Sequence, residues 1–272
     1  MKRAHAIVFT IILILSLVVL FPLYVALLMS LKTSQETFLS FYSIPAGLHL
    51  GNYIHAWNTS HYPKAFLNSL IITSGSVLLI IAVSSLAGYS IARRSSLFYQ
   101  LIFLLFLAGI MVPFQVTMLP LYKLGKILNL INTHWGIILI YGGAGVQTGV
   151  FFYTGFIKAI SRELEEAAKI DGCSVPGLFF RIIFPLLKPV TATVMVLNTL
   201  YIWNDFLLPL LFLQKDKFRT IPLQQYYFFG QYSSDLNLAF AYAVMGMIPI
   251  IAFFLLMQKF IVKGITAGAI KG

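Results

Sequence analysis

Acidic residues are scarce in this 272-residue chain, and half of them lie in one short polar segment. The chain has eight Asp and Glu residues, and four of these are Glu163, Glu165, Glu166 and Asp171. Carboxylates grouped on a short surface segment can pair with arginine or lysine side chains of another protein. The segment therefore indicates a contact with a soluble partner.

The residues around these carboxylates predict a short helix that ends in a tight turn. Arg, Glu, Leu and Ala dominate residues 161–170 and favour helix. Glu165 and Lys169 form an i,i+4 pair in the favourable order. Gly172 is well placed to end the helix, because glycine adopts a positive φ at little cost.

A second short, apolar helix is predicted after the turn. Ser174 and Pro176 suit its first positions, and Pro185 and Pro189 interrupt it before the next apolar run. The unit is thus a helical hairpin at the membrane surface. From its chemistry alone, an amphipathic interfacial hairpin with a solvated acidic face is an equal alternative to a partner-binding site.

Little else in the chain suits catalysis or energy conversion. The single cysteine, Cys173, excludes an intrachain disulfide, and the five histidines lack metal-ligand spacing. Gly125-Lys126 is followed by Ile127, so a phosphate-binding loop is absent. Asp205 is the one ionisable residue expected inside an apolar run, whereas ion-coupled carriers usually bury more acid. The chain is therefore not predicted to be an enzyme, and its energy source must lie on other chains.

The composition predicts an all-α polytopic membrane protein. Hydrophobic residues make up 59% of the chain and charged residues 10%, and the mean hydropathy is +0.89. A soluble domain needs more charge to cover its surface. Six apolar runs are long enough to span a bilayer core of about 30 Å. We predict one transmembrane domain, residues 1–272, with spans at about 7–31, 67–91, 98–121, 135–157, 190–213 and 238–262.

Two details of these spans concern their ends. The run 7–31 is too long for the apolar part of a signal peptide, so we expect it to be a retained first span. Pro113 and Pro120 fall inside the third run and predict a kink or an early end near Pro113.

Basic residues predict the orientation of the spans. An even number of spans places both termini on one side, which carries 12 of the 19 Lys and Arg residues against 7 on the other. By the positive-inside rule both termini are cytoplasmic, and so is the loop 158–189 that contains the acidic segment. The segments 32–66, 122–134 and 214–237 then face outward.

The spacing in the acidic loop resembles that of a known family. Glu166-Ala167-Ala168, Gly172, Ile182 and Pro185 resemble the "EAA" coupling loop of permease subunits from binding-protein-dependent ABC importers. Phe184 stands where that pattern usually has leucine. Trp203-Asn204-Asp205-Phe206 with Pro209, and the C-terminal run 264–272, are similar to the carbohydrate branch, in particular to its maltose-G-type subunit. The resemblance covers nearly the whole chain.

This resemblance implies roles for residues on the cytoplasmic side. The coupling loop would contact an ATPase subunit through Glu166, Ala167, Ala168, Asp171, Gly172, Ile182 and Pro185. The physical properties agree, since small side chains, one available anion and a turn glycine allow close approach. The C-terminal tail, with Thr266, Gly268, Lys271 and Gly272, would reach the ATPase dimer. A frayed terminus is the alternative for the tail.

The resemblance also implies roles outside and within the membrane. Gln225, Gly230, Gln231 and Tyr232 lie in the outward loop that would enter a solute-binding protein. An interfacial aromatic belt is the alternative there. The possible pathway residues are Asn198, Tyr201, Asn204 and Asp205. Three of them, at i, i+3 and i+7, share a helix face that can line a sugar pathway or pack against a second permease.

The expected function is that of a permease subunit in an ATP-driven sugar or oligosaccharide importer. The implied partners are a second homologous permease, two ATPase subunits, a solute-binding protein, the sugar and membrane lipid, without nucleic acid. No cofactor or metal is expected in this chain, since ATP and Mg would bind the ATPase subunits. The location is the prokaryotic cell membrane. Alternatives are a permease for another polar solute, such as glycerol-3-phosphate, and an ion-coupled secondary carrier.

Overall fold

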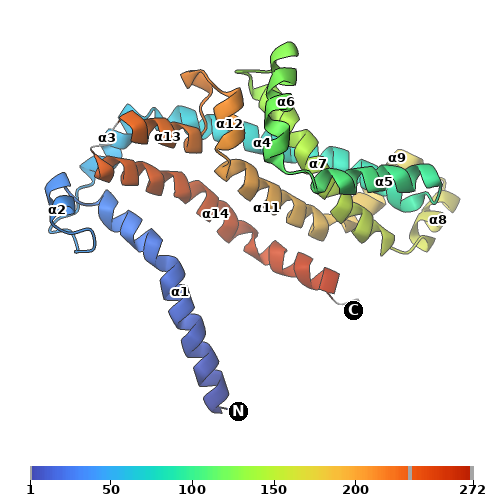
Figure 1. The fold of residues 1–272 in the computed structure, drawn as a ribbon. Coiled ribbons are helices and arrows are strands. Elements are labelled where there is room, and N and C mark those ends of the chain that lie inside the picture. The colour runs from blue at the N-terminus through green and yellow to red at the C-terminus, as the bar shows by residue number, and fades with distance from the viewer. Residues whose placement is uncertain (1, 232–234, 270–272) are drawn as a thin grey trace. The chain divides into compact units, whose positions relative to one another are not determined.

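Figure 1 shows the fold of the chain in a computed structural model. The structure describes the backbone of residues 2–231 and 235–269, and the side chains of residues 5, 7–230 and 235–260. Within these residues the chain forms helices and no strand, as the sequence predicts. Two units are distinguished: Met1–Phe66 with Ile221–Pro249, and Leu67–Thr220 with Ile250–Gly272.

The helices of the first half are α1 (Lys2–Ser30), α2 (Ser34–Leu39), α3 (Gly51–Thr59), α4 (Tyr62–Arg93), α5 (Leu97–Ile110), α6 (Phe114–Ile127) and α7 (His134–Lys158). Those of the second half are α8 (Glu163–Ile170), α9 (Val175–Leu178), the π-helix η1 (Phe179–Ile183), α10 (Phe184–Leu186), α11 (Lys188–Asn204), α12 (Leu207–Phe212), the 3-10 helix η2 (Asp216–Phe218), α13 (Ile221–Gln231) and α14 (Leu236–Ala269).

In the first unit, a buried lysine organises the loop after α1. The Lys32 side chain is fully buried, and its Nζ donates to the carbonyl oxygens of Ser40 and Phe41 and to Ser43 Oγ. Thr33 and Glu36 form a capping box at the start of α2. These bonds satisfy a buried cation with nearby oxygens and set the direction of the chain as it leaves α1.

In the second unit, the long helices alternate in direction. Helices α4 and α7 run parallel, because residue numbers increase along both helices from one contact to the next. The contacts are Gly75 with Ile138, Leu79 with Gly142 and Gly88 with Tyr153. Helix α5 is antiparallel to α7, because Phe103 lies near Lys158 and Gly109 near Gln147. Helix α11 is also antiparallel to α7, because Tyr153 bonds Thr191 and Tyr141 bonds Asp205. The end of α4, the start of α5 and the end of α7 therefore lie together.

Glycines allow α4 and α7 to approach closely. A Cβ atom added to Gly88 would lie 2.7 Å from Tyr153 Cβ and 3.2 Å from the Thr154 backbone nitrogen. Small residues at such crossings let apolar helices pack backbone to backbone in a bilayer. Helix α7 also contacts α5, α11 and α12, so it is a central helix of this unit.

Four single helices are long and apolar enough to cross a membrane, at Ile7–Ser30, Tyr62–Arg93, His134–Lys158 and Leu236–Phe260. Two bent pairs qualify as further spans, Leu97–Ile110 with Phe114–Ile127 and Val175–Leu186 with Lys188–Asn204. The described residues thus hold four to six candidate spans. The bend between α5 and α6 is 102°, which confirms the break predicted near Pro113.

The predicted span at 190–213 does not form one continuous helix, because α11 ends at Asn204 and α12 begins at Leu207. Asp205 leaves the helical conformation with ψ at 134°. Its Oδ1 accepts a hydrogen bond from the Leu207 backbone N–H, and its Oδ2 accepts one from Tyr141. Asp205 thereby ends one helix and begins the next, as short acidic side chains do at caps. The break leaves α12 as a separate short helix.

Candidate functional site

The acidic segment forms the helix and turn that its sequence predicts. Helix α8 ends at Ile170, and the N–H groups of Asp171, Gly172 and Cys173 donate to carbonyls of the last turn at 2.9–3.0 Å. Gly172 has φ at +81°, the left-handed conformation that glycine adopts with least strain. Ser174 then caps α9, its Oγ accepting a hydrogen bond from the Gly177 N–H.

The predicted coupling residues differ in exposure. Glu166, Ala167, Asp171, Gly172 and Pro185 are exposed. Ile182 is half-buried, in the π-helix η1, which the sequence did not predict. Ala168 is buried and packs within the unit, so the small surface expected from both alanines comes from Ala167. The exposed residues give α8 and its turn a surface that carries the carboxylates of Glu166 and Asp171.

Glu165 is the buried carboxylate of the segment, and it holds α8 against the end of α4. Its Oε1 accepts a hydrogen bond from Arg93 Nε at 2.5 Å, and its Oε2 accepts one from the Tyr89 hydroxyl at 2.9 Å. The side chains of Arg93 and Glu165 are 11% and 6% exposed. Arg93 Nη2 also donates to the Ile160 carbonyl at 3.1 Å, which ties down the loop before α8.

These contacts correct the expected pairing of Glu165 with Lys169. Helix α8 turns Glu165 toward Arg93 and leaves Lys169 exposed. A partly buried arginine with a fixed geometry binds a carboxylate better than an exposed, flexible lysine. Arg93 and Tyr89 are therefore site residues that the sequence reasoning missed. The sequence signal for Arg93 is the adjacent pair Arg93-Arg94 directly after an apolar run. This pair had been used only to predict the orientation of the spans.

A second cluster surrounds Tyr201, where α7 meets α11. Tyr201 and Asn198 line a cavity of about 270 Å³ with Tyr141, and Tyr201 also lines one of about 470 Å³ with Gln147. Asn198 donates to the Val194 carbonyl of its own helix at 2.8 Å. The structure thus brings together three of the predicted pathway residues, since Tyr141 holds Asp205 at 2.8 Å and packs edge-on against Tyr201.

The structure describes only some of the remaining predicted residues. Asn204 is exposed and donates to the Leu200 carbonyl. Gln225 and Gly230 belong to α13, a helix where the sequence suggested an outward loop, and Gly230 is exposed. The backbone of Thr266 and Gly268 continues α14. The side chain of Gln231, and the residues Tyr232, Lys271 and Gly272, lie outside the described part of the structure.

Comparison with known proteins identifies the chain's relatives. It is 38% identical to the melibiose/raffinose/stachyose import permease protein MelC of Bacillus subtilis, over 92% of this chain and 91% of that protein. It is 40% identical to the probable starch degradation products transport system permease protein AmyC of Thermoanaerobacterium thermosulfurigenes, over 95% and 94%. It is 39% identical to the multiple sugar-binding transport system permease protein MsmG of Streptococcus mutans, over 94% and 93%.

A solved structure and a family model agree with these relatives. A bacterial ABC transporter that imports the acidic polysaccharide alginate includes a chain with the same fold, at a TM-score of 0.81 and 21% identity, over 95% of this chain and 96% of that one. Residues 80–267 match the model for the binding-protein-dependent transport system inner membrane component. The resemblance noted in the sequence is thereby confirmed, and the chain belongs to this family of inner-membrane transport components.

Proposed function

We propose that this chain is one of two permease subunits in an ATP-driven, binding-protein-dependent importer of oligosaccharides. The proposal is supported by three relatives whose names give import of melibiose, raffinose and stachyose, transport of starch degradation products, and a multiple sugar-binding transport system, each aligned along more than nine-tenths of this chain. ATP and Mg would bind the ATPase subunits, and this chain would form half of the pathway.

We propose six spans with both termini in the cytoplasm. The alternating directions of α4, α5, α7 and α11 support successive crossings of the bilayer. Arg93 and Arg94 at the end of α4, and Lys158 at the end of α7, lie at the same end of the unit as α8. A concentration of cations at one end supports a cytoplasmic location for α8 under the positive-inside rule.

The observation that carries the proposal is the construction of α8 and its turn. Glu166, Ala167 and Gly172 form an exposed surface, while Glu165, one residue before Glu166, is bonded to Arg93 and Tyr89. A surface held rigidly by a buried ion pair can transmit a push from a bound ATPase into α4. A freely moving loop would absorb the same motion, so the ion pair favours coupling over a merely interfacial hairpin.

The cavities beside Tyr201 suit a sugar in transit. Sugar rings stack on aromatic faces and bond amides and hydroxyls. Tyr201 is 52% exposed, with Asn198, Gln147 and Thr148 close by. We therefore place a stretch of the pathway at this surface. If the surface around Tyr201 packs against the second permease instead, Tyr201→Ala will weaken the association of the two permease subunits and leave the sugar specificity unchanged.

We propose two further contacts, one with the solute-binding protein and one with the ATPase dimer. The region of Gly230 and Gln231 would contact the solute-binding protein, and a crosslinker placed at Gln231 should capture that protein. The tail from Thr266 to Gly272 would contact the ATPase dimer. Removal of the last seven residues should lower the stimulation of ATP hydrolysis, and unchanged stimulation would favour a frayed terminus.

Uptake by the reconstituted complex tests the proposed function. Proteoliposomes that contain the complex should import a labelled oligosaccharide, such as raffinose or a maltooligosaccharide, only with internal ATP and external binding protein. Uptake by the chain alone, driven by an ion gradient, would establish a secondary carrier instead. Import of glycerol-3-phosphate without import of an oligosaccharide would support an ATP-driven importer but show that its substrate is not an oligosaccharide.

A further inference from the structure

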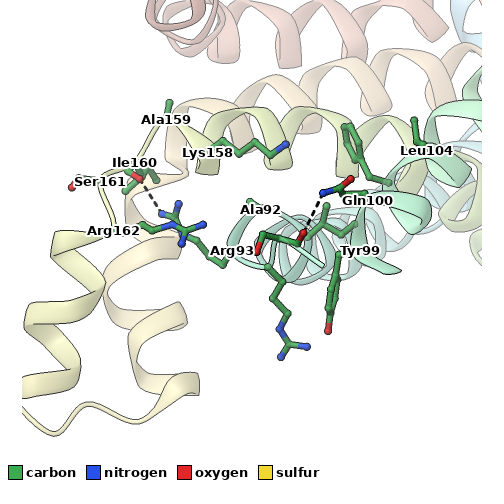
Figure 2. A pocket seen from close by; sticks show the side chains of 14 residues that line it. Ala92, Arg93, Tyr99, Gln100, Leu104, Lys158, Ala159, Ile160, Ser161 and Arg162 are labelled. Atoms are coloured by element: carbon green, nitrogen blue, oxygen red, sulfur yellow. Dashed lines mark hydrogen bonds between the residues drawn. The ribbon is translucent and has the colours of Figure 1, made fainter. Parts of the chain in front are cut away.

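A cavity of about 770 Å³ lies beside the ion pair of Glu165, at the end of the second unit that carries α8. It is bounded by the end of α4, the first turns of α5, the end of α7 and the loop that leads to α8. Figure 2 shows the Lys158 side chain extending from α7 toward Gln100 on α5, and Arg93 bonded to the Ile160 carbonyl. All of these elements belong to one unit.

The cavity is lined by cations and by no acid. Its lining includes Arg93, Arg94, Lys158 and Arg162, and contains neither Asp nor Glu. Arg93 is balanced by Glu165, which lies outside the lining. Arg94, Lys158 and Arg162 are exposed. Three further cationic residues thus line one cavity without a carboxylate in its lining, and this charge favours an anion there.

Aromatic rings hold two of these cations in place. The Arg94 guanidinium lies 4.8 Å from the centre of the Tyr99 ring, and Lys158 Nζ lies 5.5 Å from the centre of the Phe103 ring. A cation over an aromatic face keeps its N–H groups available to an anion while its position is restricted. The charges are therefore partly preorganised for a ligand.

The cavity is continuous with an exposed apolar surface along α5. Leu104, which lines the cavity, is 57% exposed. Leu97, Leu101 and Leu105 of the same helix are 69%, 55% and 73% exposed. These positions recur at the spacing of one helix face. A ligand that fills both regions must carry an anionic group and a long apolar part.

We propose that this cavity is a specific binding site for an anionic phospholipid, whose headgroup phosphate binds Lys158, Arg162 and Arg94 while an acyl chain lies along α5. Basic pockets between transmembrane helices on the cytoplasmic side recognise such headgroups. A free phosphate satisfies the cations but leaves the leucine surface of α5 uncovered, so the lipid accounts for more of the site. The site does not depend on which solute the assembly transports.

Lipid retention measured by native mass spectrometry tests the proposal. The full-length chain, in the complex with which it copurifies, is titrated in detergent with phosphatidylglycerol or phosphatidylcholine. Each cation near an anionic headgroup strengthens binding roughly fivefold, so Lys158→Gln with Arg162→Gln should weaken phosphatidylglycerol binding roughly 25-fold. Phosphatidylcholine should bind weakly to every form, and excess inorganic phosphate should not displace bound phosphatidylglycerol.

Two variants serve as controls for this experiment. Lys259→Gln removes another exposed cation that lies over an aromatic ring, 5.1 Å from the centre of Phe260, and lies outside the cavity. It should retain phosphatidylglycerol as the wild type does. Lys158→Arg with Arg162→Lys keeps both charges and should restore binding, which separates the effect of charge from any loss of folding.

Three results would overturn the proposal. The first is equal retention of phosphatidylglycerol by the wild type and the Lys158→Gln, Arg162→Gln variant. The second is displacement of bound phosphatidylglycerol by inorganic phosphate, which would make the cavity a site for a soluble anion. The third is loss of the ATPase subunit from that variant with lipid retention unchanged, which would assign the cations to a protein contact. Each result concerns the binding of lipid or of the ATPase subunit, so none of the three would contradict the proposed sugar transport.

Discussion

At the scale of single residues, the acidic segment divides its carboxylates between two tasks. Glu165 and Glu166 are neighbours in α8, but successive helical positions point about 100° apart. Glu165 therefore turns inward to Arg93 and Tyr89, while Glu166 stays exposed. One carboxylate fixes the helix, and the other is free to meet a partner.

Removal of the inner carboxylate should loosen α8. Glu165→Gln leaves the Arg93 side chain, 11% exposed, without its counter-charge. Loss of one partner from a buried ion pair costs about 3 kcal/mol. We expect a lower midpoint of thermal unfolding for the detergent-solubilised complex. The matched variant Glu163→Gln changes an exposed residue of the same helix and should stay within about 0.5 kcal/mol of the wild type. Equal effects of the two variants would contradict the assigned role of Glu165.

The turn after α8 should tolerate substitution in a definite order. Gly172 has φ at +81°, so Gly172→Ala should cost about 1 kcal/mol and Gly172→Asn less, because asparagine adopts the left-handed conformation more readily. Gly172→Pro cannot reach this φ and should displace the turn. Hydrogen exchange at the amides of residues 169–173 measures the effect. Protection that falls equally in the alanine and asparagine variants would refute the conformational explanation.

Glu36 should make the loop after α1 sensitive to acid. Hydrogen bonds from the backbone N–H groups of Thr33 and Ala46 hold the pKa of Glu36 below its ordinary value of 4.5. Since the folded pKa is the lower one, the carboxylate stabilises the loop above pH 4.5, and this contribution is lost as the pH falls toward the folded pKa. Hydrogen exchange at Ala46, corrected for its intrinsic rate, should rise below pH 4.5 in the wild type. Glu36→Gln should abolish the pH dependence, and a dependence that persists would assign it to another group.

At the scale of elements, the contact of α4 with α7 determines where the ends of the helices meet. This contact places Arg93, the last residue of α4, within reach of the loop that leads from α7 into α8. A disturbance of the packing between α4 and α7 should therefore also displace α8 and its turn.

Substitution of Gly88 tests this dependence. A Cβ there lies 2.7 Å from Tyr153 Cβ, so Gly88→Leu should force the helices apart and cost about 2 kcal/mol or more. The control is Gly155→Leu on α7, where nothing lies within 4 Å of an added Cβ. We expect Gly88→Leu to lower the thermal midpoint and weaken the ion pair of Glu165, and Gly155→Leu to do neither. A stable Gly88→Leu variant would contradict the close packing.

Helices, helix breaks and turns could be predicted from the sequence where interactions between residues close in the chain determine them. Apolar length predicted four long helices that could cross a membrane, Pro113 predicted the break after α5, and Gly172 with Ser174 predicted the turn into α9. The end of α11 was missed because Asp205 looks like a polar residue within an apolar run. Its Oδ2 also accepts a hydrogen bond from Tyr141, 64 residues earlier, a contact that the local sequence does not reveal.

At the scale of the whole molecule, the family could be predicted from the spacing between Glu166 and Pro185, whereas the arrangement of the sites could not. Arg93 and Glu165 are 72 residues apart and meet only because α4 and α7 run parallel. The cationic cavity likewise combines three helix ends. Single-sequence patterns report neighbours along the chain and not such distant contacts, so both features became visible only in the fold.

Coupling between ATP hydrolysis and sugar uptake should depend on the exposed carboxylate of Glu166, and Glu166→Arg tests this dependence. The complex is reconstituted in proteoliposomes, and sugar imported and ATP hydrolysed are measured together for this variant, for the wild type and for Glu163→Gln. Charge reversal at an interface costs enough to predict at least about a tenfold loss of uptake per ATP, with the amount of assembled complex unchanged. Glu163→Gln should retain the wild-type ratio. Wild-type uptake per ATP by the Glu166→Arg complex would contradict a coupling role for α8 and its turn.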